Sequence, residues 1–159
     1  MTNVQIDFHI ANHPHLGYRK EDHIDLEHAS VTDIQQGAFM GNAILRMPGA
    51  DFSTVDGWRG LIEWCLRLDS LVRELESGAP TTTMSEPDSD AYLKFRRQGP
   101  RLEVTSTRVG GTGVVVVEEF LDEVNRFLGR TIAWIETEHP TALLNLSASN
   151  IWARLERYR

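Results

Sequence analysis

Two stretches of this sequence repeat their apolar residues with the period of an α-helix, and this pattern constrains the fold most. In the first stretch the spacings of three and four place the apolar residues on one stripe of a helix. They are Trp58, Leu61, Cys65, Leu68, Val72 and Leu75. Ser53-Thr54-Val55-Asp56 comes before them and matches a capping box, so we predict that the helix begins near Ser53. Gly78 and Pro80 follow its last apolar residue and predict its end.

The second periodic stretch begins after Glu118 and Glu119, whose charges suit the positive end of a helix dipole. Its apolar residues are Phe120, Leu121, Val124, Phe127, Leu128, Ile132 and Ile135. Gly129 leaves an alternative, in which the helix ends there and Thr131–Thr137 forms a strand. The unbroken helical period favours one helix that continues to Glu138 and is stopped by His139-Pro140.

The remaining segments have the patterns of strands and turns. Residues 4–10 alternate between apolar and polar, which predicts a strand with one buried face. Ile24 and Leu26 indicate a second strand, and Phe39–Met47 a third that ends at Pro48-Gly49. Residues 79–90 are polar and predict a loop.

Three further strands are expected between the two helices. Ala91–Gln98, Arg101–Val109 and Val114–Val117 are separated by short glycine-containing turns, which is typical of an antiparallel meander. The tail from Ser147 to Arg159 predicts a short final helix. The chain of 159 residues is therefore expected to form a single α+β domain. We expect an antiparallel sheet of about six strands with two long helices on one face, in the order β-β-β-α-β-β-β-α plus a short C-terminal helix.

The net charge of −7 argues against nucleic acid or an anionic membrane surface as a partner. The N-terminal residues show neither a basic region nor an apolar region of a secretory signal, and no apolar run approaches the length of a membrane span. The single Cys65 cannot form an internal disulfide and is consistent with a reducing compartment. We therefore expect a cytoplasmic protein.

Five of the six histidines lie in one short segment: His9, His13, His15, His23 and His28. Imidazole groups bind zinc and similar metals when three or four ligands converge. The spacing matches no known metal motif, so exposed loop histidines are the simplest interpretation. A metal site and a pH-sensitive surface remain open alternatives. We predict no metal and no cofactor.

The meander carries a positively charged face. Tyr92, Lys94 and Arg96 alternate with Leu93 and Phe95, so the first three are expected on the solvent side of the sheet. This face could also bind an acidic surface, with Tyr92 as an aromatic anchor. Together with the acidic loop beside it, it supplies the candidate residues for contact with a partner: Glu86, Asp88, Asp90, Tyr92, Lys94, Arg96 and Arg108.

No catalytic motif is recognisable in the sequence. Cys65 lies on the apolar stripe of the first helix and is interpreted as a core residue. The glycine-rich segment 110–113 connects two predicted strands, so it is a hairpin turn and not a phosphate-binding loop. The acidic segment that begins at Asp88 has Leu93 where a calcium-binding loop needs glycine.

Three segments carry a resemblance to a group of known proteins. They are Trp58–Leu75, the meander around Tyr92–Phe95 and Arg101–Val104, and the run from Val117 to Leu121 into a helix ending at His139-Pro140. In these the chain resembles small uncharacterised α+β proteins of bacteria, especially actinobacteria. Several families of that build are immunity proteins, which neutralise a secreted toxin by binding it.

The resemblance implies a non-enzymatic binding protein with a protein partner, possibly a toxin. One alternative is a metal- or small-ligand-binding protein, or an enzyme, that uses the N-terminal histidines. Another is a homo-oligomeric structural protein such as a homodimer, in which an edge strand or Trp152 mediates self-association.

Overall fold

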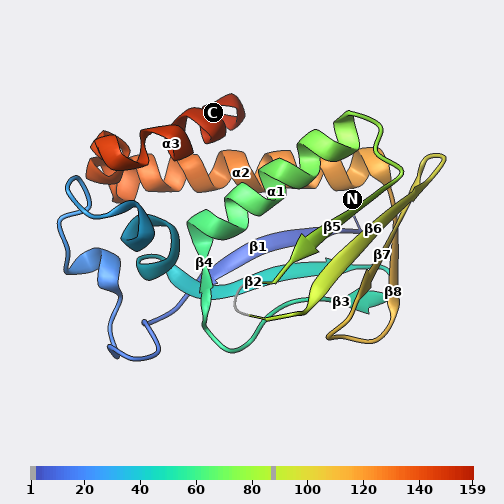
Figure 1. Ribbon diagram of the computed structural model, residues 1–159, viewed down its shortest axis with the longest axis horizontal. Helices are drawn as coiled ribbons and strands as arrows, with labels where there is room; N and C mark the ends of the chain where they lie inside the picture. The colour runs from blue at the N-terminus through green and yellow to red at the C-terminus, as the bar shows by residue number, and fades with distance from the viewer. Residues whose placement is uncertain (1–2, 87–88) are drawn as a thin grey trace.

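The computed structural model describes residues 3–86 and 89–159. The helices lie together on one side of the strands, and the predicted α+β class is confirmed (Figure 1). The strands in this part of the chain number eight and form two four-stranded antiparallel sheets, where the sequence predicted about six strands in one sheet.

The first sheet is built around one long central strand. Its members are β1 (Gln5–Ile10), β2 (Met40–Met47), β3 (Ala50–Asp51) and β4 (Arg59–Gly60). β2 pairs with all three others, and Ile6 of β1 lies opposite Leu45. The predicted alternation of β1 is confirmed at Val4 and Ile6, which are buried, and at Gln5 and His9, which are exposed.

The second sheet is a meander of four consecutive strands. They are β5 (Thr81–Ser85), β6 (Tyr92–Gln98), β7 (Arg101–Ser106) and β8 (Thr112–Val116). The last three confirm the predicted meander, whereas the prediction of a loop over residues 79–90 is wrong for β5. β5 alternates like the other strands, with Thr82 and Met84 buried. Because Thr82 is polar although it points inward, the sequence of β5 does not alternate between apolar and polar residues.

A tight contact at Gly49 joins the two sheets. The Val114 N–H donates to the Pro48 carbonyl oxygen at 3.0 Å, which links β8 to the turn after β2. Gly49 has a φ of 92°, and a Cβ atom at this position would lie 2.3 Å from the Thr112 carbonyl oxygen. Only glycine fits both the backbone conformation and the close approach of the two chains.

Helix α1 (Leu61–Glu76) begins later than the sequence predicted. The Ser53 hydroxyl accepts a hydrogen bond from the Leu45 N–H, and the Thr54 hydroxyl accepts one from the Ala43 N–H. These side chains therefore satisfy the β2 backbone and do not cap a helix, so the capping-box prediction is wrong. Trp58 accordingly lies on the surface outside the apolar stripe, and the stripe itself is buried from Leu61 onward.

Helix α2 (Val117–Glu138) is one continuous helix through Gly129 and ends before His139-Pro140, as predicted. Its apolar stripe and that of α1 cover the inner faces of both sheets, where the rings of Phe95 and Phe120 meet at 5.7 Å between centroids. No helix in residues 3–86 or 89–159 is both long enough and apolar enough to span a bilayer.

The C-terminal residues form short helical segments that lie beside α1 and α2 (Figure 1). They are η3 (Pro140–Leu144), η4 (Leu146–Ala148), α3 (Ser149–Leu155) and η5 (Glu156–Tyr158). The predicted final helix is thus confirmed. Asp69 of α1 links that helix to the C-terminal segment. Its carboxylate is fully buried and accepts hydrogen bonds from Arg154 of α3 and Tyr158 of η5, as well as from Arg73 of α1 itself.

The strand predicted at Ile24 and Leu26 is wrong. The segment between β1 and β2 holds a short 3₁₀ turn, η1 (Lys20–Asp22), and a π-helical turn, η2 (Asp33–Gly37). The buried Asn145 amide donates to the Leu26 and Ala29 carbonyl oxygens, both at 2.8 Å. A side chain from the far end of the sequence thus satisfies backbone groups that a neighbouring strand would otherwise have bonded.

Candidate functional site

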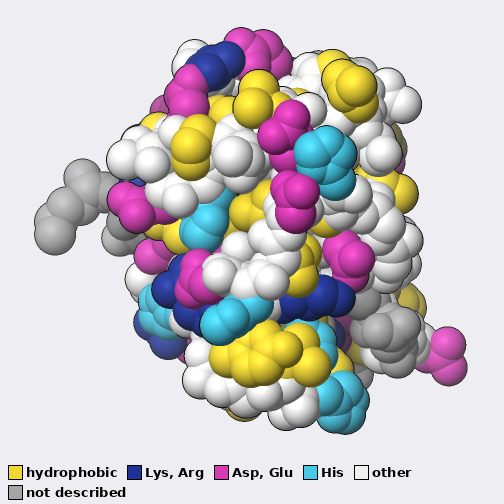
Figure 2. Space-filling model, turned by 90° about the vertical axis from the view of Figure 1, so that its left-hand side faces the viewer, with side chains coloured by type: hydrophobic (Ala, Val, Ile, Leu, Met, Phe, Trp, Pro, Cys, Tyr) yellow, Lys and Arg dark blue, Asp and Glu magenta, His cyan; other side chains and the backbone are white. Residues whose placement is uncertain are grey.

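An exposed tryptophan, Trp58, lies in the loop that directly precedes β4. The Trp58 ring lies 4.7 Å from the His15 ring and 6.2 Å from the His13 ring, in edge-to-face geometry. The face seen in Figure 2, which is the left-hand side of Figure 1 where the loops between β1 and β2 lie, shows an apolar patch with histidine side chains beside it. We define the Trp58 surface as the Trp58, His13 and His15 side chains, which contact one another, together with the exposed Leu16 and Val55 of the same two loops. Its three apolar residues are all exposed, Trp58 by 43%.

Hydrogen bonds hold the loops of the Trp58 surface in place. The His13 N–H donates to the Tyr18 carbonyl oxygen at 2.9 Å, which closes the first loop. In the second loop the Gly57 N–H donates to the Asn42 side-chain oxygen at 2.7 Å, and the Trp58 N–H donates to Asp56. Trp58 is therefore presented to solvent by backbone that is already ordered.

The His13 ring accepts a hydrogen bond that depends on its protonation state. Its Nδ1 accepts a hydrogen bond from the His15 N–H at 3.2 Å, which requires the neutral ring. Partial burial, followed by the nearby Lys20 and His15, lowers the pKa of His13 from its usual value, while Glu21 opposes the shift. Protonation of His13 is thus unfavourable in the observed loop conformation.

The N-terminal histidines do not converge. His23 packs against Tyr18, and His28 pairs with Asp25 at 2.8 Å, so each has a different neighbour from His13 and His15. Within residues 3–86 and 89–159, no three His, Cys, Asp or Glu side chains are grouped so as to hold a metal ion.

The predicted partner-contact residues of β6 lie on the outer side of the second sheet. Tyr92, Lys94 and Arg96 are exposed while Leu93 and Phe95 are buried, so the predicted orientation of this strand is confirmed. Arg96 is bound by Glu103 of β7 through two hydrogen bonds of 3.2 and 2.6 Å. Part of the positive charge predicted for this face is therefore neutralised across the strands.

The other candidate contact residues are divided between an internal ion pair and the loop. Glu86 accepts hydrogen bonds from Arg108 at 2.9 and 3.0 Å and also faces Arg59 at 3.4 Å. Asp90 is exposed, and Asp88 lies outside the described residues. The structure thus links Glu86 to Arg108 and does not assemble the six predicted residues that it describes into one surface.

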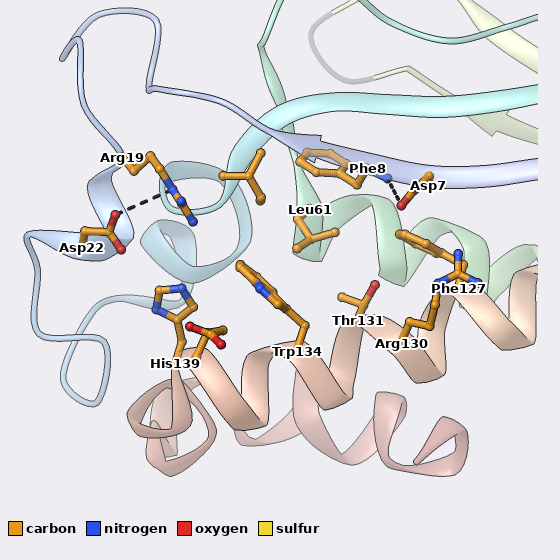
Figure 3. A pocket seen from close by; sticks show the side chains of 12 residues that line it. Asp7, Phe8, Arg19, Asp22, Leu61, Phe127, Arg130, Thr131, Trp134 and His139 are labelled. Atoms are coloured by element: carbon orange, nitrogen blue, oxygen red, sulfur yellow. Dashed lines mark hydrogen bonds and ion pairs between the residues drawn. The ribbon is translucent and has the colours of Figure 1, made fainter.

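A cleft of about 530 Å³ opens between β1, the η1 turn and α2. Trp134 extends from α2 into its middle, facing Phe8 and Leu61 (Figure 3). Arg19, Asp22 and His139 lie at one end, while Asp7, Phe127 and Arg130 lie at the other (Figure 3). Glu138 completes the charged part of the lining.

A buried carboxylate organises one wall of this cleft. Glu21 accepts hydrogen bonds from the Arg19 Nε at 3.2 Å and from the Phe39 N–H at 2.9 Å. Phe39 has a φ of 54°, which is strained for a bulky residue. Its ring contacts Trp134 and His139 at centroid distances of 5.9 and 5.1 Å. Strain of this kind is held by the surrounding structure and clusters at functional sites.

Neither the Trp58 surface nor the cleft follows from the sequence pattern. Trp58 was placed on a helical stripe, although Gly57 before it is a turn signal. The cleft residues come from positions far apart in the chain, such as Asp7, Arg19 and Trp134, so no local pattern marks them. The one local sign is that Trp134 falls outside the apolar stripe of α2.

Scans against protein-family models, curated proteins and solved structures returned no match for this chain. The geometry of the Trp58 surface, the outer sheet face and the cleft is therefore the basis on which a function can be assigned.

Proposed function

We propose that this chain is a non-enzymatic binding protein that docks a protein partner through the Trp58 surface. The observation that carries this proposal is the exposed Trp58 side chain, whose backbone is held by hydrogen bonds and whose ring packs against His13 and His15. Tryptophan is enriched among the residues that dominate binding energy at protein interfaces. A ring that is already fixed loses little conformational entropy when a partner covers it.

The charge of the molecule favours a basic partner. A net charge of −7 attracts cationic surfaces over long range and accelerates their association at low salt. In the specific form that the resemblance implies, the partner is a secreted bacterial toxin whose active site is occluded by the bound protein. The product of the neighbouring gene is then the first partner to examine.

The test compares two aromatic side chains of nearly equal exposure on different surfaces. Trp58 is 43% exposed and Tyr92 is 41% exposed, so each can be replaced by alanine with little loss of core packing. The chain is mixed with the purified product of the neighbouring gene, and the complex is measured by size-exclusion chromatography and calorimetric titration. We expect Trp58→Ala to weaken binding by at least about 2 kcal/mol, or roughly thirtyfold, and Tyr92→Ala to have little effect.

Other outcomes separate the remaining possibilities. Loss of binding in Tyr92→Ala alone would instead place the interface on the outer face of the second sheet. Light scattering that shows a dimer disrupted by Trp58→Ala would assign the Trp58 surface to self-association. Absence of any complex with the neighbouring product would count strongly against the immunity role.

A further inference from the structure

We propose that the cleft beside Trp134 is a second binding site, and that its ligand is a small organic cation with a flat apolar body. The cleft does not include Trp58, so this proposal stands or fails separately from the docking of a protein partner. A volume of about 530 Å³ lies within the range of roughly 300–1,000 Å³ typical of small-molecule sites.

The apolar part of the lining fits a flat ligand. Trp134, Phe8 and Phe127 bring three aromatic rings to the cleft, and Leu61 and Ile10 add aliphatic surface. Trp134 is partly exposed and lies in the middle of the cleft, where one ligand could contact it and Phe8 together (Figure 3). An indole face is also the best aromatic partner for a cation.

The charged part of the lining favours a cation over an anion. The lining of the cleft holds three carboxylates, Asp7, Asp22 and Glu138, against two guanidinium groups, Arg19 and Arg130, beside the His139 ring. Both cleft arginines are already close to carboxylates, since Arg19 Nε lies 3.2 Å from Glu21 and Arg130 lies 3.8 Å from Glu123. An anion bound here would face the surplus carboxylates.

Two of these carboxylates have unused capacity to bind a ligand. Across residues 3–86 and 89–159, neither Asp7 nor Glu138 forms an ion pair. Among the described residues, the hydrogen bond that the Asp7 side chain accepts comes from the N–H of its neighbour Phe8, at 2.9 Å. A cationic N–H donor in the cleft would gain a charge-assisted hydrogen bond from either carboxylate.

Contacts within the protein hold the walls of the cleft in place. The buried Glu21 fixes both the Arg19 side chain and the strained backbone at Phe39. Phe39 in turn supports the rings of Trp134 and His139. A site whose walls are fixed in advance loses less entropy on binding.

Three probes of one shape and different charge test the proposal. Calorimetric titration of the whole chain compares 2-phenylethylamine, a cation, with neutral 2-phenylethanol and anionic 3-phenylpropionate. We expect the amine to bind at least about tenfold more tightly than either analogue, because only the amine can form a charge-assisted hydrogen bond with a carboxylate. Equal or tighter binding of the alcohol or the carboxylate would overturn the proposal, and so would absence of amine binding at millimolar concentration.

Matched variants then locate the bound amine. Asp7 and the His139 end that carries Glu138 lie at opposite ends of the cleft, so the single ammonium group can bond only one of them: either Asp7→Asn or Glu138→Gln should weaken its binding by about tenfold, and the other should have little effect. Asp122→Asn is the control, because it removes the same charge from an exposed position of α2 that does not line the cleft. An equal loss in Asp122→Asn, or no loss in both cleft variants, would contradict the assigned site. Trp58→Ala should leave amine binding unchanged.

Discussion

Replacing Asp69 by asparagine removes the negative charge that holds the C-terminal helices on α1. The carboxylate is fully buried and accepts hydrogen bonds from Arg73, Arg154 and Tyr158 at distances between 2.7 and 3.2 Å. Asparagine has nearly the same shape, so the substitution tests the charge and not the packing. We expect the folded state to be destabilised.

The size of the effect follows from the exposure of the partners. Removing one member of a buried ion pair costs roughly 3–5 kcal/mol when the other charge stays buried. Here the side chains of Arg73 and Arg154 are 49% and 42% exposed, so both can turn toward water. We therefore expect a loss of about 2–3 kcal/mol, which for a chain of this length lowers the melting temperature by about 5–10 °C.

Thermal unfolding followed by circular dichroism measures this loss against a matched control. Glu76 also links α1 to the C-terminal segment, through Arg157 at 3.0 Å, but both side chains are partly exposed. Glu76→Gln should cost less than about 1 kcal/mol. Equal melting temperatures for Asp69→Asn and Glu76→Gln would refute the assignment of Asp69 as the stabilising contact.

The pH dependence provides a second check. Burial alone would raise the pKa of the Asp69 carboxyl, but hydrogen bonds from Tyr158, Arg73 and Arg154 outweigh it and hold the pKa below its usual value of 3.8. The folded state therefore binds this proton less readily than the unfolded chain, and the stabilisation is present above about pH 4. It is lost as the pH falls through the folded pKa. The difference between wild type and Asp69→Asn should accordingly shrink in acid, and an unchanged difference at about pH 2 would contradict this reasoning.

Three further predictions concern other parts of the molecule. Gly49→Ala should destabilise the protein in urea unfolding by at least about 1–2 kcal/mol more than Gly99→Ala, because both glycines have positive φ but only Gly49 abuts another strand. The pKa of His13 is lowered, so the observed loop should be most stable above about pH 6.5 and should open as the pH falls below it. The amide resonance of His15 should report this titration by NMR. Burial raises the pKa of Cys65 to about 12, so reaction with a thiol reagent should occur only at the rate of unfolding.

Each of these three has a clear contrary result. Equal losses for the two glycine variants would mean that the joint between the sheets adds no constraint. A His15 amide that does not titrate below neutral pH would show that the His13 hydrogen bond is not maintained in solution. Rapid labelling of Cys65 in the native protein would mean that α1 opens without global unfolding.

The candidate site was much less predictable than the fold. The outward orientation of Tyr92, Lys94 and Arg96 was readable, because a strand alternates its side chains regardless of what packs beside it. The pairing of Glu86 with Arg108 was not, because it depends on how β5 folds back along β6. The Trp58 surface was not readable either, because it forms where the loop that carries His13 and His15 lies beside the loop that carries Trp58.

The sequence alone determined the elements whose patterns are local. The buried stripe from Leu61 to Leu75, the continuous helix through Gly129 and the meander from Tyr92 onward all follow from periodicity that each segment carries by itself. Local periodicity also sufficed for the α+β class.

Only the tertiary structure decided which backbone N–H groups the polar side chains near residue 53 would bond. Ser53 and Thr54 could cap a helix or bond the β2 backbone, and the proximity of β2 selected the second, so α1 starts at Leu61. In the same way the joint between the two sheets depends on the approach of β8 to Gly49, and the cleft depends on the approach of β1 to Trp134. Contacts between residues distant in sequence leave no periodic trace in either segment, which is why these features appear only in the folded molecule.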